Sequence, residues 1–133
     1  MTSSNLTNRT ALITGANRGI GRAIANLLAS EGARIALHYG SDDSAAEKVL
    51  NELPGSGHIL LKANLAQADE AANLAQRAAK GLGRLDMLIN NAGVFETHCI
   101  DTTTADEWQK SWDRTIAINL TAPSLIIHAA VPY

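Results

Sequence analysis

Short apolar segments alternate along this chain with longer amphipathic ones, and this alternation limits the possible folds more than any other feature. The amphipathic segments carry apolar side chains every three or four residues, which is typical of helices packed on one side. Strict alternation of strands and helices favours right-handed units with parallel strands. Because the apolar segments are nearly continuous, both faces of the sheet should be covered. The strand candidates are ALI (11–13), RIALH (34–38), HILLK (58–62) and MLIN (87–90).

The chain therefore predicts an α/β fold, a doubly wound parallel sheet of about four strands in the order 3-2-1-4 with helices on both faces. Its 133 residues are enough for one domain and too few for two. A last helix should begin near Thr104, where Thr104 and Glu107 have the spacing of a capping box. The expected inward positions are Ile20, Ile24, Leu27 and Leu28 in the first helix, and Ala71, Leu74, Ala75, Ala78 and Leu82 in the third.

Composition excludes several classes of function. A formal net charge of −2 with 18% charged residues argues against binding nucleic acid or an anionic membrane. The longest apolar stretch, IAINLTAPSLIIHAAVPY, is interrupted by polar residues and should not span a bilayer. The start, MTSSNLTNRT, lacks a signal-peptide core, and the single Cys99 fits a reducing cytosol, so a cytoplasmic protein is expected. The four histidines lack metal-ligand spacing, and no metal site is expected.

Residues 14–21 read TGANRGIG and lie between a strand candidate and a helix candidate. The turn after the first strand of an α/β sheet places unpaired N–H groups and the helix dipole next to a bound phosphate. A Cβ atom at Gly15, Gly19 or Gly21 would block the tight turn, the approach of the phosphate or the packing of the helix. The segment thus predicts a dinucleotide site, and the alternative is a glycine-rich turn without a ligand.

Three motifs, in this order, resemble the short-chain dehydrogenase/reductase family. They are TGxxxGxG at 14–21, NNAG at 90–93, and Asn119, which matches the helix asparagine of the family's Asn-Ser-Tyr-Lys catalytic set. The resemblance implies that residues 1–133 form a dinucleotide-binding (Rossmann) domain. It also implies an NADP- or NAD-dependent enzyme that transfers a hydride between nicotinamide and a carbonyl or alcohol substrate. The general look is most similar to the β-ketoacyl carrier-protein reductases and their relatives.

In that family the glycine segment binds the pyrophosphate and the adenosine ribose of the coenzyme. A carboxylate at the end of the second strand repels a 2′-phosphate; here the matching residue is Tyr39, while Arg18 offers charge and Ser41 a hydroxyl. This points to NADP rather than NAD, although Arg18 could be a solvated surface residue, and a shifted loop could bring Asp42 or Asp43 to the ribose. The resemblance assigns coenzyme binding to Gly15, Asn17, Arg18, Gly19, Ile20, Gly21, Tyr39, Ser41, Asn64, Leu65, Asn91, Ala92 and Gly93.

Two asparagine segments carry more specific expectations. Asn64 stands where the family usually has an aspartate that meets the adenine amino group, and its side-chain carbonyl can accept the same hydrogen bond. A simple turn role for Asn64 is the alternative. In NNAG, residues 91–93 should pass under the coenzyme, whereas Asn90 is expected to tie neighbouring strands together.

Asn119 can also be argued from its helix. Trp112, Ile116, Pro123 and Ile127 would form an apolar stripe that includes Asn119, so its amide should be buried and need partners. Pro123 has no N–H to give to the Asn119 carbonyl, so the helix should bend and leave that carbonyl free. In the family this carbonyl holds a water on the proton path to the catalytic lysine. The alternative is an asparagine that serves only the kink.

The chain departs from the family in its catalytic residues. Its only tyrosines are Tyr39 and Tyr133, and neither has a lysine four positions on. We therefore expect the amino-terminal half of a Rossmann domain, truncated before the Ser and Tyr-x-x-x-Lys segments. Such a half should be marginally stable and inactive alone, with its fourth strand as an exposed edge and its last helix partly uncovered.

Three functions remain in competition. The first is an NADP-dependent oxidoreductase, a homo-oligomer in its full-length form, with this chain as its cofactor half. The second is a non-catalytic nucleotide-binding or interaction module derived from that family. An extended-family epimerase or dehydratase is disfavoured by the spelling of NNAG. The substrate's identity cannot be read from these residues.

Overall fold

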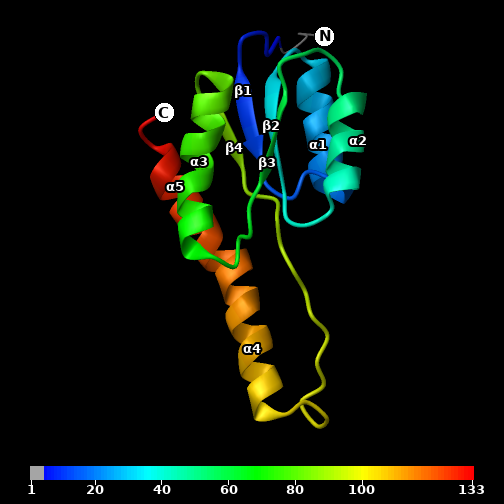
Figure 1. Ribbon diagram of the computed structural model, residues 1–133, viewed down its shortest axis with the longest axis vertical. Coiled ribbons are helices and arrows are strands. Elements are labelled where there is room, and N and C mark those ends of the chain that lie inside the picture. Colours follow the sequence, from blue (N-terminus) through cyan, green and yellow to red (C-terminus); the bar gives the residue numbers. More distant parts are fainter. Residues whose placement is uncertain (1–4) are drawn as a thin grey trace.

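The computed structural model describes residues 5–133 and contains one parallel sheet (Figure 1). Its strand order is β3-β2-β1-β4, which confirms the predicted 3-2-1-4 order and parallel pairing. β4 lies at one edge, and its three residues are all partly exposed, as expected for an edge strand. The strands are β1 (Thr10–Ile13), β2 (Arg34–Tyr39), β3 (Ile59–Lys62) and β4 (Met87–Ile89).

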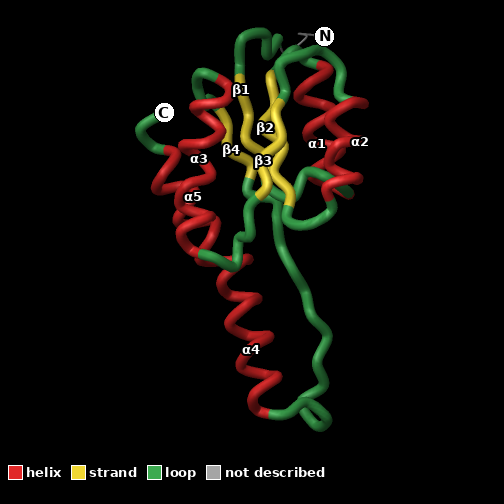
Figure 2. The backbone as a smooth tube through the Cα atoms, in the orientation of Figure 1, coloured by secondary structure: helices red, strands yellow, loops and turns green. Residues whose placement is uncertain are grey.

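Helices cover both faces of the sheet, as predicted. Figure 2 shows α1 and α2 on one side of the strands and α3 and α5 on the other. α4 leaves this body and projects beyond the carboxyl ends of the strands, beside the extended segment that follows β4. The helices are α1 (Gly19–Ser30), α2 (Asp43–Glu52), α3 (Ala68–Leu82), α4 (Ala105–Ile116), the π-helix η1 (Ala117–Thr121) and α5 (Ala122–Ala130).

Two hydrophobic clusters explain why the strands are apolar without alternation. Successive side chains of a strand point to opposite faces, and in β1 Ala11 and Ile13 belong to the cluster under α1 and α2, whereas Leu12 belongs to the cluster under α3 and α5. All three are fully buried. Burying a side chain of the size of Leu12 or Ile13 stabilises the fold by about 1.5–3 kcal/mol. Because these two residues face opposite clusters, both helix layers are held through the same strand.

The inward face of α3 is as predicted, but that of α1 is not. Ile20 and Leu27 are 74% and 60% exposed, and the residues that α1 buries are Gly21, Ala25 and Ala29. The small side chains of these buried residues let α1 pack closely against the turn that precedes it. Side chains as large as isoleucine or leucine at the same positions would prevent this approach. Ile24 and Leu28 pack at the margin of the core.

The last helical segment begins with the predicted capping box, in which Thr104 and Glu107 bond each other's backbone N–H groups. The predicted apolar stripe is wrong: Trp112 and Ile127 are 54% and 53% exposed. Buried instead are Ile118, Ala122 and Ile126, on the side that packs against α3. The π-helical turn inserts a residue into the helical period, so positions before and after it do not share one face.

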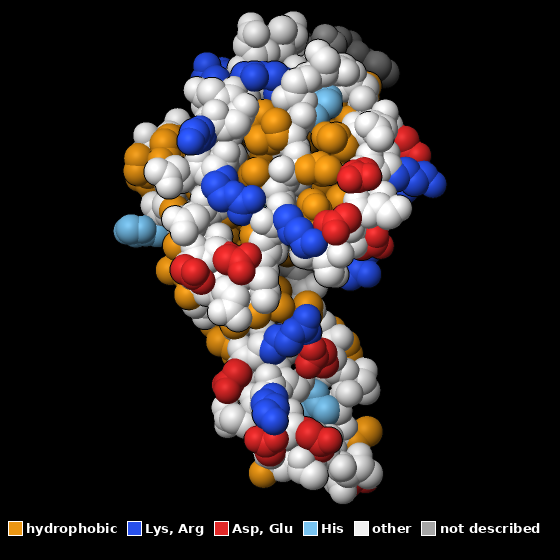
Figure 3. Space-filling model, in the orientation of Figure 1, with side chains coloured by type: hydrophobic (Ala, Val, Ile, Leu, Met, Phe, Trp, Pro, Cys, Tyr) orange, Lys and Arg blue, Asp and Glu red, His pale blue; other side chains and the backbone are white. Residues whose placement is uncertain are grey.

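The distribution of charge on the surface is mixed, as the small net charge of −2 would suggest. On the face shown in Figure 3, acidic and basic side chains are interspersed over both the body and the α4 arm, and neither sign forms a continuous patch. Within residues 5–133, no helix is long and apolar enough to cross a membrane.

Candidate functional site

A cleft of about 860 Å³ lies at the carboxyl ends of the strands. This volume is typical of a site for a cofactor-sized ligand, and the edge where strand order reverses around β1 is where α/β sheets bind ligands. Its walls come from the segments after all four strands and from the last helices. They are Gly15, Asn17, Arg18, Gly19, Ile20, His38, Gly40, Ser41, Asp42, Ala45, Ala63, Asn64, Leu65, Asn91, Ala92, Gly93, Val94, Arg114 and Ile118.

The glycine turn at the floor of this cleft has the geometry that its sequence predicts. Gly19 has φ +53°, and a Cβ there would meet nothing within 4 Å, so its missing side chain leaves open space. At Gly21 a Cβ would lie 2.5 Å from the Gly15 carbonyl oxygen, so only glycine lets α1 pack this closely. Arg18 is the N-cap without a side-chain capping bond, and the first turn has no acidic residue. The amino end of α1 therefore faces the cleft uncapped.

Asn91 fastens the NNAG segment to the glycine turn. Its Nδ2 donates to the carbonyl oxygens of Thr14 and Gly15, at 2.9 and 3.1 Å. The Thr14 hydroxyl accepts from the N–H groups of Asn91 and Ala92, at 3.0 and 2.9 Å. The tie between strands was predicted for Asn90, whose side chain is exposed, and this assignment is wrong. Alternate residues of extended backbone face opposite ways, and it is Asn91 that faces β1.

His38 lies beneath the same turn and is only 2% exposed. Its Nδ1 accepts a hydrogen bond from the Gly15 N–H at 3.1 Å, and its Nε2 lies 3.1 Å from the Ala63 carbonyl oxygen. Its own carbonyl accepts from the Ala16 N–H at 2.9 Å. Burial lowers the pKa of His38 below its usual value. No function was assigned to His38 from the sequence. The signal in the sequence was a polar residue inside an apolar strand.

The two carboxylates that follow β2, Asp42 and Asp43, have different surroundings. Asp43 lies outside the cleft, where it accepts from the Tyr39 hydroxyl at 2.8 Å and from Lys62 Nζ at 2.9 Å. The Lys62 hydrogen bond lowers the pKa of Asp43, and the bond to Asp43 raises that of Tyr39. Asp42 lines the cleft, but its Oδ1 caps α2 by accepting from the Ala45 N–H at 2.9 Å.

Arg18 is exposed at the mouth of the cleft, and no ion pair with it is found among residues 5–133. Ser41 lines the cleft on the side of β2. Tyr39 is not brought to the cleft walls, because its hydroxyl is directed to Asp43.

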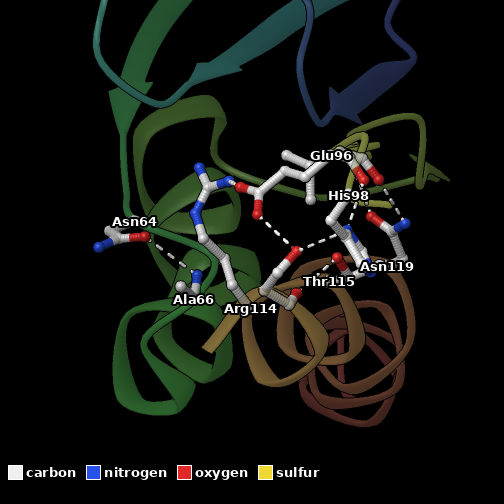
Figure 4. Close-up of polar contacts among 9 residues, drawn as sticks. Asn64, Ala66, Glu96, His98, Arg114, Thr115 and Asn119 are labelled. Carbon is white, nitrogen blue, oxygen red and sulfur yellow. Dashed lines mark hydrogen bonds and ion pairs between the residues drawn. The ribbon is translucent and has the colours of Figure 1, made fainter. Parts of the chain in front are cut away.

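The turn after β3 presents Asn64 and Leu65. Asn64 Oδ1 accepts from the Ala66 N–H at 3.0 Å (Figure 4), and the Asn64 N–H donates to Glu70 Oε2 at 2.6 Å. One lone pair of Oδ1 and both Nδ2 hydrogens thus remain for a ligand. Leu65 is buried, and with Ile118 it adds apolar surface to this part of the cleft.

Asn119 clamps the chain beyond NNAG instead of lying buried. Its Oδ1 accepts from the Val94 N–H and its Nδ2 donates to the Val94 carbonyl, both at 2.8 Å (Figure 4). The predicted burial is wrong, because the side chain is exposed. Asn119 lies in the π-helix at 117–121, in the part of the helix that was predicted to bend. Gly21, Tyr39 and Asn119 are the three predicted site residues outside the cleft walls.

A polar network joins the extended segment after β4 to α4. Ser111 Oγ donates to Glu96 Oε2 at 2.9 Å, and Arg114 forms an ion pair with the same carboxylate (Figure 4). The Ser111 hydrogen bond and the charge of Arg114 lower the pKa of Glu96. His98 packs edge-on against Trp108, with ring centroids 4.5 Å apart. The network orients Arg114, a wall of the cleft that the sequence did not indicate.

Within residues 5–133, no group of three or more His, Cys, Asp or Glu side chains is arranged to hold a metal ion. The polar groups of the cleft are backbone N–H groups, the amides of Asn17, Asn64 and Asn91, and the side chains of Arg18, Arg114, His38, Ser41 and Asp42. Such a surface complements an elongated anionic ligand with polar and apolar parts.

Comparisons with known proteins fit this geometry. A family model described as short chain dehydrogenase matches residues 9–133. A 3-oxoacyl-[acyl-carrier-protein] reductase FabG of Staphylococcus aureus is 36% identical over 126 residues, which cover 93% of this chain and 50% of the relative. A short-chain type dehydrogenase/reductase of Picea abies is 39% identical over 119 residues, 84% of this chain and 43% of the relative.

Solved structures give the same result. A short chain dehydrogenase from Burkholderia cenocepacia in complex with NADP superimposes with a TM-score of 0.87 at 34% identity, over 97% of this chain and 52% of that one. The angucycline C-6 ketoreductase LanV with bound NADP superimposes with a TM-score of 0.85 at 37% identity, with the same coverage. The chain thus spans about half the length of the relatives it matches.

Proposed function

The chain belongs to the short chain dehydrogenase family, and on this premise we propose that it binds NADP and forms the coenzyme side of an oxidoreductase. The reaction is hydride transfer between nicotinamide and a carbonyl or alcohol substrate. The observation that carries the proposal is the uncapped amino end of α1, which opens on a cleft of about 860 Å³ at the carboxyl ends of the strands.

The N–H groups available to the pyrophosphate are those of the first turn of α1. The Gly15 and Ala16 N–H groups are used internally by His38, so the phosphate-binding donors begin at Gly19 and Ile20, which line the cleft. The helix dipole adds positive potential at the same place. Asn91, Ala92 and Gly93 form the wall along which the coenzyme passes, and Asn64 and Leu65 hold the adenine.

The charges at the end of β2 favour NADP over NAD. Arg18 is exposed at the cleft mouth and available to a 2′-phosphate. The two carboxylates that could select NAD are already engaged: Asp43 by Lys62 and Tyr39, and Asp42 by the Ala45 N–H. Ser41 adds a hydroxyl on the same wall. Tyr39 supports this site by holding Asp43 away from it.

When bound, the coenzyme would supply the hydride. The residues of this chain bind and orient the coenzyme. Asn119 secures the segment after β4 through Val94, so its side chain is not free for substrate. What it offers to a proton path is its main-chain carbonyl, since Pro123 has no N–H to give to it.

Fluorescence titration with NADPH and NADH tests the proposal. We expect NADPH to bind at least about tenfold more tightly, and Arg18→Ala to remove about tenfold of the NADPH affinity with little effect on NADH, because a charge-assisted phosphate contact is lost. Arg22→Ala is the matched control, since Arg22 lies on the same helix and pairs with Glu52. Equal affinities for both coenzymes, or equal effects of the two variants, would contradict the NADP assignment.

A second candidate is a non-catalytic nucleotide-binding module. It is favoured by one observation: Tyr39 is bound to Asp43 and lies outside the cleft walls. Gene sequence following Tyr133 separates the candidates, because an in-frame serine followed by Tyr-x-x-x-Lys supports the enzyme.

We also propose a cytoplasmic protein that is a homo-oligomer in its full-length form. α4 buries no residue, and Trp112, Leu120 and Ile127 are more than half exposed on this part of the chain. An exposed Cys99 thiol fits a reducing compartment. Light scattering of the full-length protein tests the oligomer, and a monomer at all concentrations would contradict it.

A further inference from the structure

The buried His38 side chain is the part of the cleft floor that coenzyme chemistry leaves unexplained. It is only 2% exposed, yet it bonds two segments that meet only in the folded chain: the glycine turn after β1 and the end of β3. Its main-chain carbonyl holds the next N–H of the same turn. Two successive amides of the turn are therefore fixed by one residue.

The two hydrogen bonds allow a single protonation state. The Gly15 N–H can only donate, so Nδ1 must be unprotonated. The Ala63 carbonyl can only accept, so Nε2 must carry the hydrogen. Only the neutral Nε2–H tautomer satisfies both partners. A proton on Nδ1 would set two donors against each other at 3.1 Å and break the contact with the turn.

Burial lowers the pKa of the His38 ring, and the charge of Arg77 on α3 acts in the same direction, while the hydrogen bond to the Ala63 carbonyl opposes them. Three further charged groups line the cleft with His38: Arg18 at the start of α1, Arg114 on α4, and Asp42, whose carboxylate is engaged by the Ala45 N–H. The charge of Arg114 is paired with Glu96.

We propose that His38 is a positioning residue that holds the phosphate-binding turn in its coenzyme-competent form, and that coenzyme affinity falls when this ring is protonated. The inference rests on the proposed coenzyme function of the cleft. The mechanism is indirect: His38 orients the Gly15 and Ala16 amides inward, which leaves the following amides at Gly19 and Ile20 aimed at the phosphates. When the Gly15 bond is lost, the turn is released and those amides lose their alignment.

The chain contains a natural control. His58 makes the same pattern of bonds at the other end of β2, where Nδ1 accepts from the Ile35 N–H at 3.0 Å and Nε2 lies 2.9 Å from the Pro54 carbonyl oxygen. It is not among the residues that line the cleft. A titration effect that belongs to the phosphate turn should therefore follow His38 and not His58.

The experiment measures the NADPH dissociation constant by fluorescence titration between pH 5 and 8, with full-length protein, for the wild type, His38→Asn, His38→Phe and His58→Asn. The 2′-phosphate of the coenzyme itself titrates at about pH 6. The quantity compared is therefore the difference in NADPH dissociation constant between the wild type and His38→Asn at each pH. Asparagine can accept from the Gly15 N–H but does not titrate. Phenylalanine cannot accept.

Below the pKa of His38, wild-type affinity should fall about tenfold per pH unit beyond any fall seen in His38→Asn, because one proton is bound as the coenzyme is released. His38→Asn should stay within about threefold of the wild type at pH 8, and His38→Phe should bind about tenfold more weakly at every pH. His58→Asn should keep the wild-type profile. Nitrogen NMR of the imidazole, without coenzyme, should show the Nε2–H tautomer even if His38→Phe does not fold.

The outcomes are distinct. Binding with the same pH profile in wild type and His38→Asn, a profile altered by His58→Asn, or an Nδ1–H tautomer would each overturn the role of His38 alone. Absence of NADPH binding at pH 8 in the wild type would overturn the proposed function instead.

Discussion

Gly19 and Gly21, in the proposed coenzyme-binding turn, have different roles. Alanine substitution at each position distinguishes these roles. At Gly21 an added Cβ would lie 2.5 Å from both the Gly15 carbonyl oxygen and Asn91 Nδ2, so we expect the free energy of unfolding to fall by about 1–3 kcal/mol. At Gly19 there is open space, and only the φ of +53° is unfavourable, at about 1 kcal/mol.

We expect Gly19→Ala to affect coenzyme affinity more than it affects stability. The Cβ of Gly19→Ala would enter the space that the phosphate needs, so NADPH should bind about tenfold more weakly while the fold stays largely intact. Chemical denaturation and NADPH titration of both variants measure the two effects. A Gly21→Ala protein as stable as wild type, or a Gly19→Ala protein with unchanged affinity, would show that these roles are assigned wrongly.

The residues of the cleft were predictable where backbone geometry demands a residue type, and not where side-chain direction decides. Glycine spacing located the turn, because a positive φ at Gly15 and Gly19 and close backbone contact at Gly21 favour glycine there. The exchange of Asn90 for Asn91 has a simple reason: neighbouring residues of extended chain face opposite ways, and the register of β4 on β1 is not written in either residue. The same holds for His38, whose partners come from two other segments.

At the scale of elements, Asp86 joins the starts of β1 and β4. Its carboxylate accepts from the Thr10 N–H at 2.9 Å, from the Thr10 hydroxyl at 3.1 Å and from Arg9 at 3.0 Å, and it pairs with Arg84. Burial opposes the charged form, but these hydrogen bonds outweigh it and lower the pKa of Asp86 from 3.8 to about 2. The carboxylate therefore stabilises the fold at neutral pH.

Asp86→Asn should lower the free energy of unfolding at pH 7 by about 2 kcal/mol. Because the folded pKa is depressed, this contribution is complete above pH 3.8 and is lost as pH falls toward about 2. The gap between wild type and variant should thus close on acidification, as measured by denaturant unfolding at a series of pH values. Asp101→Asn, at an exposed loop position, is the control and should show no gap. A gap that persists at pH 2 would contradict the assignment.

Elements were predicted well where one signal dominates. The strands and α3 follow from apolar runs and from a regular helical period, and α4 starts at its capping box. The last helices were misjudged because a uniform period of 3.6 residues was assumed through 112–127. The π-helix at 117–121 breaks that period, and Ile118 and Ile126 become the buried positions in place of Trp112 and Ile127.

At the scale of the whole molecule, the proposed coenzyme site is built by a different part of the chain than α4. The segments after the four strands line the cleft, and His38 and Asn91 form hydrogen bonds with the glycine turn. Helix α4, by contrast, buries none of its residues, although its Ser111 and Arg114 hold Glu96 of the segment after β4. The described residues therefore build the proposed coenzyme site on one side, and α4 adds no buried residue on the other.

This separation predicts the behaviour of the 133-residue polypeptide itself. It should bind NADPH, because the donors of α1 and the Asn91 tie are present, but it should not oxidise NADPH with any carbonyl substrate. Proton transfer to the substrate oxygen needs an acid beside the nicotinamide. Tyr39 is held by Asp43, and neither Tyr39 nor Tyr133 lines the cleft. Equilibrium titration and a coenzyme-oxidation assay on one sample, with a full-length relative as positive control, measure both properties. Turnover by a monomeric 133-residue sample would place the proton donor within these residues and refute the division of labour.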